Sequence, residues 1–454
     1  MKKIPNTKVA SPSPSEDSKE MLTKSPERPP ARDNATRRWN TGPTRPPIEP
    51  QPGPGEWRVW PWRDLGDKVA FALGLLILAL PGPFMGVLIG TGELSMAILR
   101  FIWRLTPLPR IVPPLIKSFA ETWGQKLLKD PRNGPFLPHM LWLSVWMPTL
   151  FLASMYYHSL HGFSWVFFFV YHFLRIGPRF RFFAHLHVLV HREGHENLGL
   201  FKAPYGFLNH WPMQWLVGPF YGQVPNSYGI AHNKIHHRYD NGLDDVHTNL
   251  DLDRTKFSSF VIYAPRFFLY WAGISPLIHF LLRKEWVFAR KMFLGMLYHV
   301  ALFYAISCYD LTFAVAFILY PFLESIVFFS GISYLWHCWV DPEDPYNPYV
   351  TSVTILKGHD NIWNEDYHVI HHDNLTLHWS LAPKHFEENR AEYARNKATV
   401  FEDTEEGAML FWMLSGNWDM LAKHFVDLDG KLDHAQKKAL LLRRASFVVR
   451  PQCQ

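Results

Sequence analysis

Long apolar runs alternate with polar segments along the chain, and this pattern predicts helices that cross a membrane. The runs lie at residues 69–89, 140–157, 163–174, 292–307 and 311–334. A straight crossing needs roughly twenty apolar residues, so some of the shorter runs could be re-entrant or lie at the membrane interface. Pro81 and Pro83 interrupt the first run. We therefore expect an all-α integral membrane protein with about four transmembrane helices in hairpin pairs.

The last two apolar runs form the clearest predicted hairpin, because only residues 308–310 separate them. The first of these runs follows four basic residues, Arg283, Lys284, Arg290 and Lys291. Basic residues favour the cytosolic side of a membrane, so the hairpin should begin and end on that face. Two crossings return the chain to its starting side. Segments before residue 283 and after residue 336 are therefore expected to meet in a cytosolic helical cap.

The N-terminal segment differs in composition from the rest of the chain. It is rich in Pro, Ser and charged residues, and residues 1–63 hold 12 Lys or Arg against 7 Asp or Glu. Such a segment cannot bury enough apolar surface to offset the entropy of the chain. We expect a disordered basic arm over residues 1–56, a membrane-embedded domain over residues 57–425, and a polar C-terminal tail over residues 426–454.

Composition also argues against several classes of function. The three cysteines, Cys308, Cys338 and Cys453, are too few and too scattered for a disulfide framework or a zinc finger, so a reducing compartment is expected. No basic helix or aromatic-basic motif accompanies the basic arm, which argues against nucleic-acid binding. No cleavable secretory signal is visible, so internal segments should drive membrane insertion.

Many of the 24 histidines gather in three clusters, at residues 185–196, 232–240 and 365–378. On a helix, residues four apart stand on one face, so His191 and His195 can point at one metal ion, with His187 along the same stripe. Isolated histidines in an aromatic-rich membrane protein are usually satisfied core or interfacial residues. We interpret four histidines in this way: His158, His161, His172 and His299.

The clusters predict a metal site, because adjacent imidazoles repel when charged and lose solvation when neutral. Eight or more imidazole nitrogens exceed what one tetrahedral zinc can use. Two iron ions with imidazole ligands and open positions for O2 would employ them all. Carboxylates within the clusters are expected to orient the imidazoles or to be solvated: Glu193, Glu196, Glu365 and Asp366.

The three clusters resemble the histidine boxes of the membrane fatty acid desaturase superfamily, which read His-x-x-x-His, His-x-x-His-His and His-x-x-His-His. Residues 191–195 resemble the first box and residues 368–372 the third, and the segment ending in His337 resembles one where acyl-lipid desaturases place a further ligand. The resemblance covers roughly residues 135–385. It implies nine metal ligands: His191, His195, His232, His236, His237, His337, His368, His371 and His372. An Asn near the metals is also implied, either Asn364 or Asn361.

The second box departs from the family pattern, because His232 lies four residues before His236 instead of three. This longer spacing is similar to the middle box of membrane alkane monooxygenases, which hydroxylate their substrates. Desaturation and hydroxylation therefore both stay open. The third box and the segment at His337 favour desaturation.

The resemblance implies an oxidoreductase in which residues 57–425 form the catalytic domain, with two iron ions as cofactor and O2 as co-substrate. The substrate would be a fatty acyl or lipid chain, with Trp363 and Trp379 either lining its path or serving as interfacial aromatics. The chain has no haem-binding His-Pro-Gly-Gly motif, dinucleotide fingerprint or iron-sulfur cysteine set. A separate b-type cytochrome or ferredoxin with its reductase should supply electrons. A multi-pass protein of the endoplasmic reticulum is expected.

Two other hypotheses explain less of the sequence. A zinc-dependent membrane hydrolase would use about three histidines and a water, and would leave most of the clustered histidines without a role. A non-catalytic scaffold with the same fold would be expected to have lost box histidines, whereas all three boxes here retain them.

Overall fold

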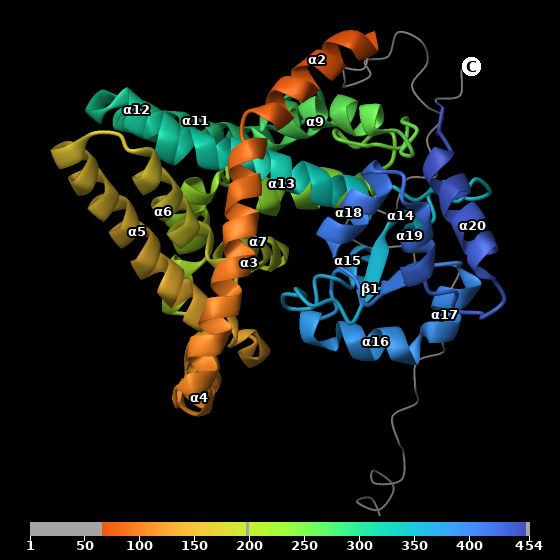
Figure 1. The fold of residues 1–454 in the computed structure, drawn as a ribbon, viewed down its shortest axis with the longest axis horizontal. Helices are drawn as coiled ribbons and strands as arrows, with labels where there is room; N and C mark the ends of the chain where they lie inside the picture. Colours follow the sequence, from red (N-terminus) through yellow and green to blue (C-terminus); the bar gives the residue numbers. More distant parts are fainter. Residues whose placement is uncertain (1–65, 197–198, 451–454) are drawn as a thin grey trace, which may run out of the picture. The chain divides into compact units, whose positions relative to one another are not determined.

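The chain is mostly helical in a computed structural model (Figure 1). The structure describes residues 66–196 and 199–450, so the predicted arm at residues 1–56 lies outside the described residues. Strands are few: β1 (Val353–Leu356) pairs in parallel with β2 (Thr399–Glu402). This small sheet corrects the expectation of an all-α fold, because residues 46 positions apart pair only through the tertiary fold.

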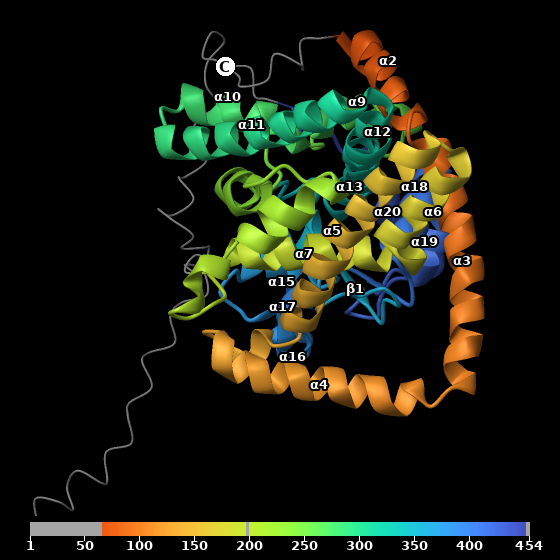
Figure 2. The ribbon, with the colours of Figure 1, turned by 90° about the vertical axis from the view of Figure 1, so that its left-hand side faces the viewer.

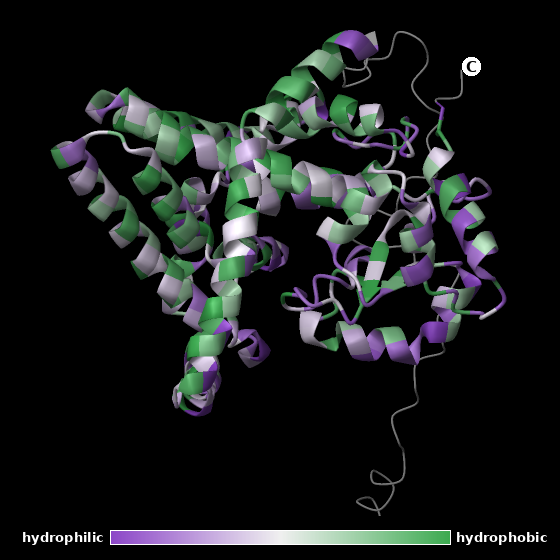
Figure 3. Ribbon diagram, viewed as in Figure 1, coloured by the Kyte–Doolittle hydropathy of each residue, from purple (hydrophilic) through white to green (hydrophobic). Residues whose placement is uncertain are grey.

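Four stretches of the described residues are long and apolar enough to cross a membrane, in agreement with the expected number. They are Asp67–Leu105, Phe136–His161, Trp286–Tyr309 and Leu311–Trp336. Colouring by hydropathy shows apolar residues concentrated along α3, α11 and α13, and many hydrophilic residues on α16 and α20 (Figure 3). The first stretch comprises α2 (Gly66–Ala79) and α3 (Gly82–Leu105). The two helices meet at Pro81 and Pro83, the prolines that interrupt this apolar run.

After the first stretch the chain continues through α4 (Leu108–Leu127), α5 (Phe136–His161) and α6 (Trp165–Ile176). Figure 2 shows α4 running across the lower end of α3. The twelve residues of α6 span only about 18 Å at 1.5 Å per residue, too short for a full crossing. The apolar run at residues 163–174 is therefore one of those that does not cross by itself.

The two apolar runs of the predicted hairpin correspond to α11 (Trp286–Tyr309) and, after it, to α12 (Leu311–Ala314), the π-helix η9 (Val315–Leu319) and α13 (Tyr320–Trp336). One residue, Asp310, separates α11 from α12. Its carboxylate accepts a hydrogen bond of 2.7 Å from the backbone N–H of Phe313, which caps the start of the second helix. The hairpin therefore turns within a single capped residue.

A bent pair of helices, α9 (Phe257–Trp271) and α10 (Ile274–Leu282), precedes the hairpin. The two helices are bent by 68°, and Gly273 between them has φ of 83°, a conformation that glycine adopts without steric cost. The sequence analysis did not identify this pair, because Pro265 and Arg266 interrupt its apolar pattern. Its length and bend are those of a broken span or a re-entrant loop.

A buried ion pair joins α6 to α13. Arg175 and Glu324 are both fully buried, and the guanidinium donates a hydrogen bond to the carboxylate. Arg175 also donates to Nδ1 of His172 at 3.1 Å. Both charges are removed from water, so each is stabilised mainly by the other.

We expect Arg175→Met to destabilise the protein by about 3–5 kcal/mol, because it leaves an uncompensated buried carboxylate. The double variant Arg175→Met with Glu324→Leu should lie closer to wild type than either single variant. Thermal unfolding of the detergent-purified proteins measures both effects. If the stability loss of the double variant equalled the sum of the losses of the two single variants, the two charges would not depend on each other.

The helices that follow α13 surround the small sheet and form a compact group (Figure 1). They are α14 (Pro348–Thr351), α15 (His368–Asp373), α16 (Ala382–Glu388), α17 (Arg390–Arg395), α18 (Glu406–Leu414), α19 (Trp418–His424) and α20 (His434–Ser446). Leu441 and Ala445 of α20 are buried in the main core. Much of the stretch assigned to a polar tail, residues 426–454, therefore packs as part of the fold, although the assigned domain boundaries stay predictions.

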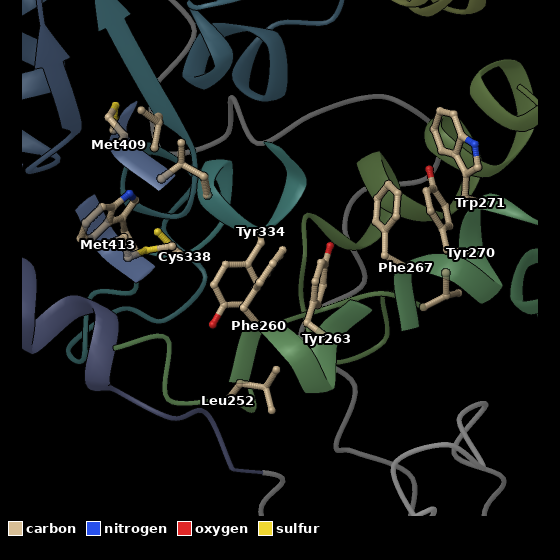
Figure 4. Packing of buried hydrophobic residues seen from close by; sticks show 14 of the residues in the cluster. Leu252, Phe260, Tyr263, Phe267, Tyr270, Trp271, Tyr334, Cys338, Met409 and Met413 are labelled. Atoms are coloured by element: carbon tan, nitrogen blue, oxygen red, sulfur yellow. The ribbon is translucent and has the colours of Figure 1, made fainter. Parts of the chain in front are cut away.

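Aromatic side chains form much of the core between α9 and α13 (Figure 4). The ring of Tyr334 lies 5.3 Å from that of Phe260 and 5.1 Å from that of Tyr263. Met409 and Met413 of α18 complete the same cluster. This packing fixes the C-terminal end of α13, which carries His337.

Candidate metal centre

Four segments of the chain, far apart in sequence, carry the clustered histidines. The first box lies at the end of α7 (Arg181–His195), and the second spans the π-helix η8 (Ser227–His236) and α8 (His237–Tyr239). His337 follows the last residue of α13, and the third box is the short helix α15. All nine histidines predicted as ligands lie where these elements meet, as the contacts between their side chains show.

The π-helical form of η8 explains how the longer second box still fits. A π-helix closes its hydrogen bonds over one residue more than an α-helix. Residues four and five apart in a π-helix therefore take nearly the places of residues three and four apart in an α-helix. The additional residue between His232 and His236 is absorbed in this way, so the longer spacing does not remove these imidazoles from the centre.

In the part of the chain that the structure describes, the nine histidines divide into two groups. Within each group, the ligand nitrogen atoms all lie within 4.8 Å of one another. One group has five members, His191, His195, His232, His237 and His371, and the other has four, His236, His337, His368 and His372. We call them the five-histidine group and the four-histidine group. All three boxes contribute to the five-histidine group. The second and third boxes and His337 form the four-histidine group.

The Nε2 atoms within each group face one another. In the five-histidine group, Nε2 of His191 lies 2.7 Å from Nε2 of His232 and 3.2 Å from Nε2 of His195. In the four-histidine group, Nε2 of His337 lies 3.1 Å from Nε2 of His236 and 3.3 Å from Nε2 of His368.

The pair His236 and His337 shows why this arrangement suits a metal ion. Nδ1 of His236 donates to the carboxylate of Asp245 at 2.7 Å, and Nδ1 of His337 donates to the carbonyl oxygen of Thr351 at 3.0 Å. A neutral imidazole that donates through Nδ1 has its lone pair on Nε2. The two facing Nε2 atoms are both acceptors, and they repel unless a cation lies between them. The residues present therefore fit a bound metal.

Carboxylates orient several of these rings. An oxygen of Glu365 lies 2.6 Å from Nδ1 of His191, and the same carboxylate pairs with Arg192 at 2.8 Å. An oxygen of Asp240 lies 2.8 Å from Nδ1 of His372. Ligating histidines generally donate their second ring nitrogen to such a group, which fixes the tautomer.

Burial controls the protonation of the site. Burial and the neighbouring imidazoles lower the pKa of His195 and His232 well below the usual value, so both rings are neutral at pH 7. Burial alone would raise the pKa of Glu365, but Arg192 and His191 lower it overall and keep the carboxylate charged. Neutral imidazoles beside charged carboxylates are the protonation states that metal binding requires.

Asp245 and His247 were missed by the sequence analysis. Nδ1 of His247 lies 3.0 Å from the Asp245 carboxylate, which also accepts from His236. Burial opposes ionisation of Asp245, but His247 and His236 hold the pKa of this carboxyl well below its usual range. The only sequence signal was the spacing Asp-x-His eight residues after the second box, which carries no helical or box pattern.

We expect Asp245→Asn to weaken metal binding by about 10–100-fold, because the amide supplies a poorer acceptor for His236. Metal titration of the purified, metal-depleted protein measures this change. Asp251→Asn is the matched control, since Asp251 pairs with Arg266 at 2.6 Å and belongs to neither histidine group. Unchanged affinity in Asp245→Asn would contradict a positioning role.

The structure places other predicted site residues outside the two histidine groups. Nε2 of His187 lies 3.3 Å from the carbonyl oxygen of Tyr221, and Glu196 accepts from Asn133 at 3.3 Å. Glu193 accepts from the backbone N–H of His210 at 2.6 Å.

The candidate asparagines also have partners away from the metals. Asn364 donates to the carbonyl oxygen of Trp379 at 3.1 Å, and the side chain of Asn361 accepts from the backbone N–H of Asp366 at 3.4 Å. The choice between the two asparagines therefore stays a prediction. Trp363 packs edge-to-face on Phe136, with ring centroids 4.7 Å apart, and Trp379 stacks on the same ring at 5.7 Å.

A cavity of about 330 Å³ adjoins the histidines. His191, His232, His236, His337 and His368 line one part of it. Its wall is largely apolar and includes Ala184, Val188, Trp271, Phe328, Phe329 and Ile332. Trp363 and Trp379 are not among its lining residues. An apolar chain fits such a wall, because burial of methylene groups is favourable there.

Comparison with known proteins agrees with this site. The fatty acid desaturase family matches residues 163–404, which is more than half of the chain. The chain therefore belongs to the fatty acid desaturase family, and it is a membrane oxidoreductase that acts on lipid or acyl chains by desaturation or hydroxylation. No curated protein and no solved structure matches it.

Proposed function

We propose that this protein is a non-haem di-iron enzyme that uses O2 to desaturate a fatty acyl or lipid chain. The main support is that nine imidazoles divide into two groups beside one apolar cavity. The five-histidine group would hold one iron and the four-histidine group the other. When bound, the irons would supply the reactivity toward O2 that is needed to remove hydrogen from an unactivated methylene group.

The protein itself would orient the ligands and position the substrate. Glu365, Asp240 and Asp245 direct the Nε2 atoms of three rings inward. The apolar cavity would exclude water and hold a methylene beside the histidines that line it. Positioning of this kind decides which carbon reacts, because the reacting atoms must be held close together and aligned.

Hydroxylation is the second candidate, and the spacing of the second box is the observation that favours it. The π-helix η8 brings the longer box into the centre, so the number of available imidazoles does not distinguish the two reactions. Both begin with removal of hydrogen from the chain. They differ in whether a second hydrogen leaves or an oxygen atom is added.

The histidines would lie on the cytosolic face of a membrane, and the endoplasmic reticulum is the proposed location. Two candidate spans, α11 and the α12–α13 stretch, separate the first two boxes from the third. Because the boxes meet, the total number of crossings between them should be even. This parity favours a re-entrant α9–α10 pair over a fifth span, and the basic residues before α11 favour the cytosol.

Electrons would come from a separate b-type cytochrome or a ferredoxin with its reductase. The sequence motifs for an internal haem, nucleotide or iron-sulfur centre are absent. Purified protein should therefore turn over only when such a donor is added. Turnover with the isolated chain and NADPH alone would contradict an external carrier.

Elemental analysis and lipid profiling test the proposal together. Wild type should hold about two irons per chain, and cells expressing it should contain a new alkene in their lipids. His236→Ala with His371→Ala changes one member of each group and should remove both metals and the product. A new alcohol would establish hydroxylation. One zinc, or no metal with unchanged lipids, would favour a hydrolase or a non-catalytic scaffold.

A further inference from the structure

The same cavity has a second, charged part. Arg179, Arg181, Asp360, Glu405 and Glu406 line it together with Glu93 and Asp366. Arg181 begins α7 and His191 lies ten residues further along the same helix. At 1.5 Å per residue this places the two residues about 15 Å apart along the helix axis. We call the charged part the carboxyl-rich mouth, defined by Glu93, Asp360, Asp366, Glu405 and Glu406.

The two arginines at the mouth are already paired. Arg179 lies 2.8 Å from a carboxylate oxygen of Glu93, 3.1 Å from one of Asp360 and 3.5 Å from one of Glu405. Arg181 lies 3.1 Å from the second oxygen of Asp360. Five carboxyl groups thus face two guanidinium groups. Both guanidinium groups already have anionic partners, so neither is free to bind a phosphate or carboxylate.

Asp366 and Glu406 form no ion pair with any residue in the ranges 66–196 and 199–450. Asp366 is only 4% exposed and lines the cavity. Gly358 makes room for it, because a Cβ at that position would lie 2.0 Å from Oδ2 of Asp366. A buried carboxylate without an ion-pair partner is costly unless a ligand supplies one.

Two further carboxyl groups point to the same chemistry. Asp360 and Glu405 both lie against Arg179, at 3.1 and 3.5 Å, so their carboxylates are close enough to repel each other when both are ionised. An ammonium group or a hydroxyl donor placed beside them would relieve this repulsion through charge-assisted hydrogen bonds. A phosphate would instead meet carboxyl groups, beside two arginines that are already paired.

We propose that the carboxyl-rich mouth binds the head group of the lipid substrate, and that this head group is a hydrogen-bond donor of the long-chain amine or amino-alcohol class. This inference rests on the proposed function, since it assigns a substrate class to the same cavity. The alkyl chain would extend along α7 toward the histidines. Phosphate-rich thioesters and free fatty acids are the head groups that this mouth disfavours.

Competition binding to the detergent-purified protein tests the assignment. Tritiated octadecylamine would be the probe, and octadecanol, octadecanoate and octadecanoyl-coenzyme A the competitors. Unlabelled octadecylamine should compete at least tenfold better than either anionic competitor, with octadecanol between them. A better competition by octadecanoate or by the coenzyme A thioester would overturn the proposal. The assay needs no turnover, so its failure leaves the metal measurements unaffected.

Two variants with opposite expected effects separate recognition from unfolding. Glu405→Gln with Glu406→Gln should weaken octadecylamine binding about tenfold and leave octadecanol binding unchanged. Arg179→Gln should strengthen octadecylamine binding, because it frees carboxylates from their present partner. Glu387→Gln is the control, since Glu387 pairs on the surface with Arg390 and its side chain is 66% exposed. Weaker amine binding in both mouth variants, or no change in either, would sink the assignment.

Discussion

Replacing His337 by alanine should lower the iron content from about two per chain to about one and reduce activity to background. His337 belongs to the four-histidine group and its Nε2 faces two other ring nitrogens of that group. Removal leaves three imidazoles, while the five-histidine group keeps all its members. The proposed reaction uses both irons to reduce O2, so loss of one should stop it. Elemental analysis and lipid profiling of the same preparation measure the two effects.

The mirror variant and a surface control make this result specific. His195→Ala changes only the five-histidine group and should also leave about one iron. His161→Ala, at the exposed end of α5, should retain both irons and full activity. If His337→Ala and His195→Ala each kept two irons, the division into two metal sites would be wrong.

Filling the cavity should also remove most of the activity, but without loss of iron. Ala184 lines the cavity on α7 two turns before His191, so Ala184→Phe places a ring in the space proposed for the alkyl chain. We expect activity on long chains to fall about 100-fold or more, equal to about 2.7 kcal/mol in the barrier. The iron content should stay near two, because no histidine is changed.

Ala153→Phe is the matched control for this variant. Ala153 is exposed on α5, a candidate span, so the same substitution there should face lipid and leave activity within about twofold of wild type. Shorter substrates should recover part of the lost activity in Ala184→Phe. Equal activity of Ala184→Phe and wild type on long chains would show that the chain does not enter this cavity.

The histidines were predictable because each box is local. The periodicity of a helix places His191 and His195 on one face, and the order of the boxes then indicates which segments meet. All nine histidines named from the sequence lie in the two groups, and their role as ligands stays a prediction. The two-crossing argument also anticipated that the third box returns to the first two.

The division into five and four histidines could not be predicted, because it depends on tertiary packing. His236 and His237 are neighbours in sequence but belong to different groups, because successive residues of a helix point about 100° apart around its axis. The partner role of Asp245 depends on a loop with no periodic pattern. The parallel pairing of β1 and β2, and the bend at Gly273, likewise arise from contacts between segments far apart in the chain.

The way each histidine group is shared between distant parts of the chain constrains when the protein can mature. The five-histidine group needs His371, and the four-histidine group joins His236 to residues that follow the second half of the hairpin. When the second box has just left the ribosome, neither histidine group is therefore complete. Under the proposed function, neither iron site can have all its ligands until α13 is in place and about 370 residues have been synthesised. Quality control that senses unfilled histidines would thus report on completion of the whole membrane domain.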